Sequence, residues 1–109
     1  MLDKERVRKI AREYSEEVRK VLNPESIILF GSYANGNPHE ESDIDIAVLV
    51  KGVDGEDWYN SRILLQRIIR NKDFLDIEPH LLDESRDPSG FVEHVIKTGE
   101  VIYPSYPSA

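Results

Sequence analysis

The chain has 109 residues, of which 39% are hydrophobic and 32% are charged, a balance typical of one globular domain rather than of a disordered segment. It has no cysteine, which excludes disulfide bonds and thiolate metal sites, and no apolar run approaches the length that spans a bilayer. The formal net charge of −7 argues against direct binding of nucleic acid, which draws on lysine and arginine. We therefore expect a cytoplasmic domain without membrane contact, whose acidic surface suits a basic protein partner.

The first half of the sequence predicts one long helix and two strands. Apolar residues recur every three or four positions over residues 2–22, which indicates an amphipathic helix. The apolar run at 26–30 has the residue types of a buried strand. A single helical turn at 33–36 and a loop precede a second apolar strand at about 43–50. The charged residues of the long helix are typical of a solvated face and include Arg6, Arg8 and Arg12.

The second half predicts two further helices and two further strands. Pro79 has no N–H to donate, so the strand that contains it is expected at an edge of the sheet or with its end exposed. The alternation of helices and strands predicts a mixed α/β domain over residues 1–103, with a small sheet flanked by helices, and a loose tail at 104–109. The expected elements are a helix at 56–71, a strand at 74–80, a helix that starts at Asp87-Pro88 and ends at Gly99, and a strand at 101–103.

A Gly-Ser pair and an Asp-x-Asp motif are separated by ten residues, and each adjoins a predicted strand. Asp43 and Asp45 lie two apart on one strand, so both side chains point to the same face, where they repel each other unless a cation lies between them. Such oxygen ligands suit Mg²⁺ together with nucleotide phosphates. The turn at Gly31 and Ser32 can present N–H groups and a hydroxyl to a triphosphate. Ser42 is a further nucleotide-binding candidate, although a turn residue is the more frequent role there.

A third acid is expected on the third strand, because two-metal nucleotidyl transfer uses one to activate the attacking group. Asp76 and Glu78 have the same parity on that strand, so either could face the site. Glu78 is preferred as the catalytic acid and metal ligand, and Asp76 remains the alternative. His80 ends the strand and could approach the site, but a structural role is the more frequent one.

The spacing of Gly31-Ser32 and Asp43-Ile44-Asp45, with strands on both sides, resembles the signature of the DNA polymerase β-type nucleotidyltransferases. More narrowly, most of the chain resembles the minimal nucleotidyltransferases, or MNT proteins. The resemblance implies the polymerase β-like fold and the transfer of AMP from ATP with two Mg²⁺ ions. It also implies that Asp43, Asp45 and the third acid hold metal, and that Gly31 and Ser32 bind the triphosphate.

The resemblance implies a partner as well. MNT proteins are commonly antitoxins of a toxin–antitoxin pair, and they silence a HEPN-domain ribonuclease toxin by adenylylating it, typically on a tyrosine. A HEPN toxin in a hetero-oligomer with this chain is therefore expected. The family often has arginine at the position of Asn35, so one charged phosphate or acceptor contact is missing here. A non-catalytic antitoxin that masks its partner stays open as an alternative, as does transfer to a small molecule.

Overall fold

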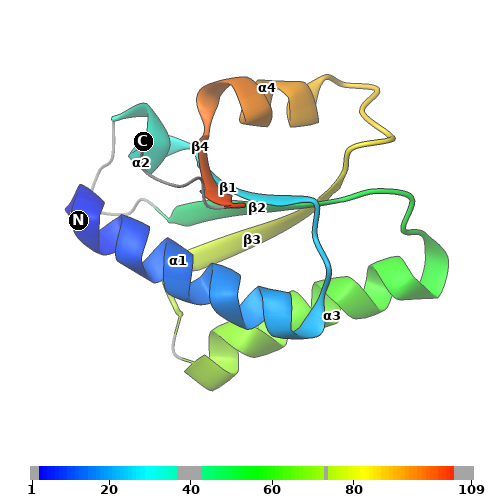
Figure 1. Ribbon diagram of the computed structural model, residues 1–109, viewed down its shortest axis with the longest axis horizontal. Helices are drawn as coiled ribbons and strands as arrows, with labels where there is room; N and C mark the ends of the chain where they lie inside the picture. The colour runs from blue at the N-terminus through cyan, green and yellow to red at the C-terminus, as the bar shows by residue number, and fades with distance from the viewer. Residues whose placement is uncertain (1–2, 37–42, 73, 105–109) are drawn as a thin grey trace.

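The computed structural model describes residues 3–36, 43–72 and 74–104, in which helices and strands alternate (Figure 1). Their order is the expected one, which confirms the mixed α/β class. The expected tail lies, from residue 105 onward, outside the described residues. Within the described ranges, no helix has both the length and the apolar content that a bilayer crossing requires. The elements are α1 (Lys4–Val21), β1 (Ser26–Phe30), α2 (Ser32–Asn35), β2 (Ile44–Val50), α3 (Gly55–Lys72), β3 (Ile77–Asp83), α4 (Phe91–Thr98) and β4 (Glu100–Tyr103).

The four strands form one mixed sheet in the order β3-β2-β1-β4. Strand β1 pairs antiparallel with β2 and with β4, whereas β2 and β3 are parallel. A parallel pair needs a long crossover connection, and α3 provides it. Strand β3 lies at one edge of the sheet, as Pro79 predicted.

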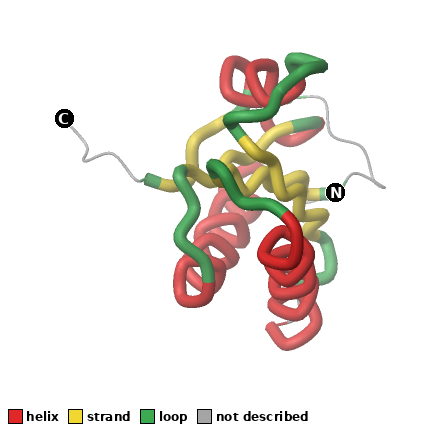
Figure 2. The backbone as a smooth tube through the Cα atoms, turned by 90° about the vertical axis from the view of Figure 1, so that its right-hand side faces the viewer, coloured by secondary structure: helices red, strands yellow, loops and turns green. Residues whose placement is uncertain are grey.

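Helices cover the two faces of the sheet unequally. Helices α1 and α3 lie against one face, and the short helix α4 lies over the other (Figures 1 and 2). Because side chains alternate along a strand, β1 and β2 contribute to two separate cores. The larger core, on the side of α1 and α3, includes Ile27, Leu29, Ile44, Ile46 and Val48. The smaller core, under α4, consists of Ile28, Ala47, Leu49, Val92 and Val95.

The predicted boundaries of two elements are wrong. The third strand ends at Asp83 rather than at residue 80, so His80 lies within it. The third strand begins at Ile77 rather than at residue 74, because Phe74 packs into the larger core and its N–H donates to the carbonyl of Ile69 at 3.0 Å. The last helix begins at Phe91 rather than beside Asp87. The carboxylate of Asp87 still caps that helix across the intervening turn, as it accepts the N–H groups of residues 92 and 93 at 2.9 and 3.1 Å.

Candidate active site

The two predicted metal-binding aspartates lie at the start of β2, but they occupy different surroundings. Asp45 belongs to the strand, points to the face that α4 covers, and has a partly buried side chain. Asp43 comes just before the strand and is exposed. Asp45, and not Asp43, belongs to a cluster of possible metal ligands that also includes Glu78 and His80.

The strand register decides which of the two third-acid candidates lies beside Asp45. In the parallel pair of β2 and β3, Glu78 is directly opposite Asp45. Asp76 precedes β3 in a turn, where its backbone carbonyl accepts the N–H of Ile44 at 2.7 Å. The structure therefore brings Glu78, and not Asp76, next to Asp45.

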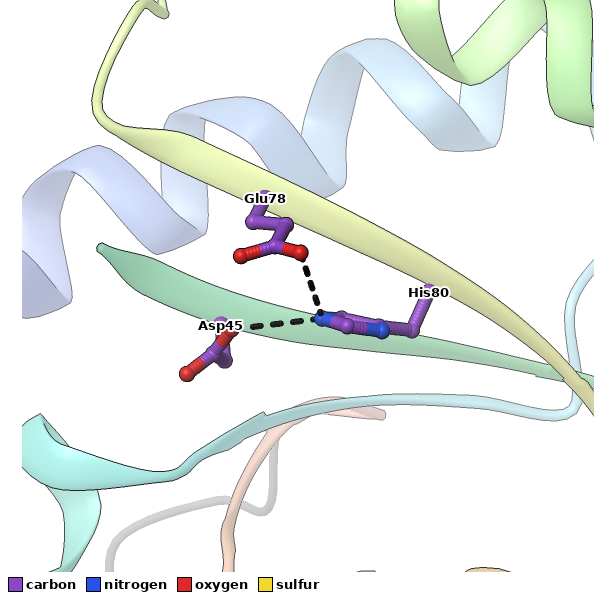
Figure 3. Close-up of side chains that lie close together, drawn as sticks. All are labelled: Asp45, Glu78 and His80. Carbon is purple, nitrogen blue, oxygen red and sulfur yellow. Dashed lines mark hydrogen bonds and ion pairs between the residues drawn. The ribbon is translucent and has the colours of Figure 1, made fainter.

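His80 completes a cluster with these two acids, as Figure 3 shows. Its Nε2 atom is 3.2 Å from Oδ1 of Asp45 and 3.9 Å from Oε1 of Glu78. One ligand atom from each of the three residues lies within 4.8 Å of the other two. The hydrogen bond to Asp45 raises the pKa of the His80 imidazole, against the opposing effect of its partial burial. The sequence favoured a structural role for His80. The structure instead places its ring nitrogen beside both acids of the candidate site.

The chemistry of this donor set fits a divalent cation. Two carboxylates offer the hard oxygens that Mg²⁺ prefers, and a neutral imidazole adds a nitrogen ligand that Mn²⁺ and similar ions also accept. The Nε2 atom of His80 faces both acids, so all three side chains could contact one cation.

The turn after β1 brings its backbone unusually close to Asp45. Gly31 has a φ of +78° and a ψ of −150°, a conformation that residues with a Cβ rarely adopt. A Cβ atom placed on Gly31 would collide with Oδ2 of Asp45. Ser32 begins the short helix α2 directly after this turn and is partly buried. Ser42 lies outside the described residues, as does the side chain of Asn35.

Two aromatic side chains that were not predicted from the sequence lie beside the cluster. The ring of Phe30, at the end of β1, packs edge-on against His80 with 5.0 Å between ring centroids. On its other side the same ring meets Phe91 of α4 at 5.8 Å, and Phe91 is 41% exposed. Phe30 directly precedes Gly31 and pairs with Asp45 in the antiparallel register of β1 and β2. Knowledge of that register would have placed Phe30 beside the site.

Comparison with known proteins gives a consistent picture. The sequence model of the family described as "Polymerase beta, Nucleotidyltransferase" matches residues 5–107. A Methanocaldococcus jannaschii protein named "Putative protein adenylyltransferase MJ0126" is 30% identical over 100 residues, which are 89% of this chain and 93% of that protein. A second protein of this organism with the same description, MJ0141, is 43% identical over 44 residues. That match covers 38% of this chain and less than half (44%) of the relative.

Two solved structures share the fold. A nucleotidyltransferase from Sulfolobus solfataricus, itself described as putative, has a TM-score of 0.66 and 30% identity, with 90% of this chain and 80% of that chain covered. A toxin–antitoxin structure with AMP-PNP has a TM-score of 0.54 and 27% identity, with 95% and 75% covered. Since the family model spans almost all of the sequence and a full-length relative agrees with it, this chain belongs to the polymerase β-type nucleotidyltransferases.

Proposed function

We propose that this chain transfers AMP from ATP to a hydroxyl group of a partner protein and releases pyrophosphate. The observation that carries the proposal is the pairing of Asp45 with Glu78 across β2 and β3, next to a glycine turn whose backbone lies against the Asp45 carboxylate. Asp45, Glu78 and the nearby Asp43 are the proposed metal ligands, and Mg²⁺, in two ions, is the proposed metal. When bound, Mg²⁺ would neutralise charge on the triphosphate and on the attacking and leaving oxygens.

The residues of the chain have separate roles in this mechanism. The backbone at Gly31 and Ser32 holds the β- and γ-phosphates, so that the α-phosphorus faces the acceptor hydroxyl. The acceptor oxygen forms a bond to that phosphorus while the bond to pyrophosphate breaks, and Glu78, which is more exposed than Asp45, takes the hydroxyl proton. His80 orients Asp45 through their hydrogen bond at 3.2 Å.

We propose further that the acceptor is a tyrosine of a HEPN-type toxin and that the chain acts as the antitoxin in a cytoplasmic hetero-oligomer. The resemblance of Gly31-Ser32 and Asp43-Ile44-Asp45 to the MNT signature supports this partner. So does the likeness to a toxin–antitoxin structure that contains an ATP analogue. An acceptor protein would also supply surface that a domain of this size does not provide by itself.

The test is label transfer from α-labelled ATP to a purified HEPN-domain toxin. We expect labelled toxin with the unchanged protein, and a loss of at least about a hundredfold in rate with Asp45→Asn or Glu78→Gln. Glu13→Gln, which removes an exposed carboxylate from the outer side of α1, is the matched control and should retain the rate. Equal labelling by the Asp45→Asn variant and the unchanged protein would refute the catalytic proposal.

A second candidate is an antitoxin that neutralises its partner by covering it. The contact between His80 and Asp45 favours this alternative, since it occupies a carboxylate oxygen that a metal ion would otherwise use. Inhibition of the partner that survives the double change Asp43→Asn and Asp45→Asn, without label transfer, would support masking over catalysis.

A further inference from the structure

A groove lies between helix α3 and the edge strand β3, away from the candidate active site. Its volume is about 670 Å³, and all but one of its lining residues come from α3, the exception being Pro79 of β3. Pro79 has the opposite parity to Glu78 and His80 on the strand, so the groove and the acidic cluster lie on opposite faces of the sheet. Figure 1 shows α3 below the sheet to which β3 belongs. The groove is therefore a separate feature of the molecule.

Three arginines converge on this groove in a chain that is otherwise acidic. Arg62, Arg67 and Arg70 line it, and their side chains are exposed. Among the described residues, none of the three has a carboxylate within ion-pair distance. The formal net charge of the chain is −7, so there is no shortage of acidic side chains that could have paired with them. The guanidinium groups are left available for an external anion.

Apolar groups lie between these charges. Tyr59 is 64% exposed and Ile63 is 37% exposed, whereas Leu65 forms a buried floor. Arginine and tyrosine are the residue types enriched in the centres of protein interfaces. A mixed surface of this kind binds a ligand that brings both negative charge and an apolar side chain.

We propose that the groove binds a segment of a partner protein in which aspartate or glutamate residues alternate with large apolar residues. Guanidinium groups form paired hydrogen bonds with carboxylates, and the apolar side chains would cover Tyr59 and Ile63. A nucleic acid is disfavoured because its long phosphate backbone would meet the net negative field of the whole chain. A small molecule is disfavoured because the exposed lining encloses too little of it.

The docking site is separate from the acidic cluster, since the groove and the cluster share no residue. In an enzyme that modifies a protein, binding at a second face would hold the acceptor while its hydroxyl group enters the active site. This raises the effective concentration of the acceptor without a new contact at the reacting atoms.

The test uses a short fluorescein-labelled peptide in which Asp and Glu alternate with Leu, with fluorescence anisotropy as the readout. The triple variant Arg62→Gln, Arg67→Gln and Arg70→Gln should bind it about tenfold more weakly than the unchanged protein, because charge-assisted hydrogen bonds are lost. The matched control changes three exposed cations elsewhere that have no ion pair among the described residues, and it should retain binding. These are Arg6→Gln, Lys9→Gln and Lys51→Gln.

Two further probes separate the outcomes. A peptide with Asn and Gln in place of the acids should bind weakly, and amide resonances of residues 59–70 should shift on addition of the acidic peptide while those of 44–46 stay in place. If the acidic peptide does not bind, or binds the triple glutamine variant and its control equally, the proposal is overturned. Tighter, arginine-dependent binding of an oligouridylate would overturn it in favour of a nucleic-acid site.

Discussion

Replacement of Gly31 by alanine tests how closely the turn after β1 depends on having no side chain. The residue has φ +78° and ψ −150°, a region that only glycine occupies readily, so a Cβ there costs about 1–3 kcal/mol in backbone strain. The added Cβ would also collide with Oδ2 of Asp45, whose backbone is held by the pairing of β2 with β1. We therefore expect Gly31→Ala to lower the free energy of unfolding by about 2–3 kcal/mol and to displace the Asp45 carboxylate.

Gly36 provides the matched control, because it has the same φ of +78° but no atom within 4 Å of an added Cβ. Gly36→Ala should cost only about 1–2 kcal/mol, the strain of a left-handed residue, and should leave Asp45 in place. Urea unfolding measures both losses, and titration with Mn²⁺ followed by its electron paramagnetic resonance signal measures the site. The reasoning fails if the Gly31→Ala protein binds Mn²⁺ as tightly as the Gly36→Ala protein and is no less stable.

Three further predictions concern the site and the helix above it. Glu78→Gln should weaken Mn²⁺ binding at least about tenfold while Asp76→Asn leaves it nearly unchanged, and equal losses would contradict the register argument. The hydrogen bond to Asp45 raises the pKa of His80, so in metal-free protein the stability from this pair is complete below pH about 6.5 and falls as pH rises through the raised pKa. His80→Gln should therefore make the melting temperature depend less on pH over that range. An unchanged dependence of the melting temperature on pH would count against the pair. Asp87→Ala should lower stability by about 1 kcal/mol in urea unfolding and Asp87→Asn by less, since the asparagine oxygen can still accept from the helix N–H groups.

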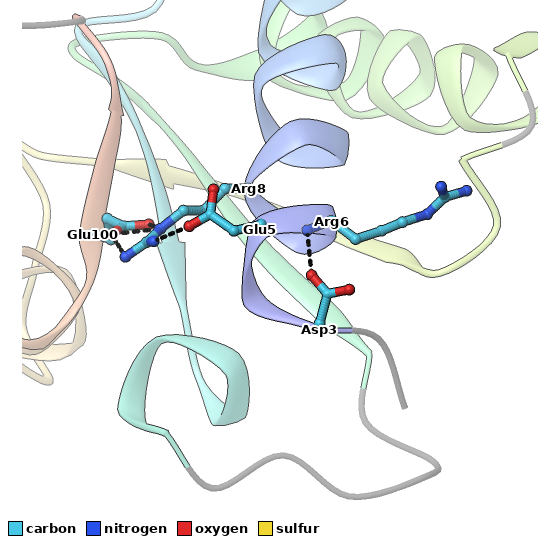
Figure 4. Close-up of polar contacts among 5 residues, drawn as sticks. All are labelled: Asp3, Glu5, Arg6, Arg8 and Glu100. Carbon is cyan, nitrogen blue, oxygen red and sulfur yellow. Dashed lines mark hydrogen bonds and ion pairs between the residues drawn. The ribbon is translucent and has the colours of Figure 1, made fainter.

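The fold was largely predictable because most of its helices and strands have a strong pattern of apolar residues. Apolar residues recur every three to four positions over 2–22, and this pattern predicted α1 closely. The apolar runs of β1 and β2 likewise predicted strand positions that differ little from the observed ones. Long-range partners were not predictable. Arg8, expected on a solvated helix face, instead forms two-armed hydrogen bonds with Glu100 of β4 at 2.8–3.1 Å, while Asp3 caps the same helix (Figure 4). No local pattern links residues so distant in sequence.

The candidate site was predictable where its residues are close in sequence and uncertain where they are not. Asp45 and Gly31 follow from a motif within one hairpin-like unit of the chain. The choice between Asp76 and Glu78 depends on where β3 begins and how it pairs with β2, and a shift of two residues exchanges one acid for the other without changing the parity. Period-two reasoning therefore cannot separate them. The packing of Phe74 into the core, which the sequence pattern treated as the start of a strand, is what sets that position.

The position of His80 follows from the same register and explains why the site and the core cannot be altered independently. Phe74 and Ile77 pack into the larger core and fix β3, which places Glu78 opposite Asp45. Two residues further on the same face, His80 is then held between Asp45 and the ring of Phe30. A change that moves β3 by one residue would turn Glu78 and His80 toward the larger core, where an unpaired charge is costly. The burial of apolar residues on one face of β3 therefore selects the register that assembles the acids on the other.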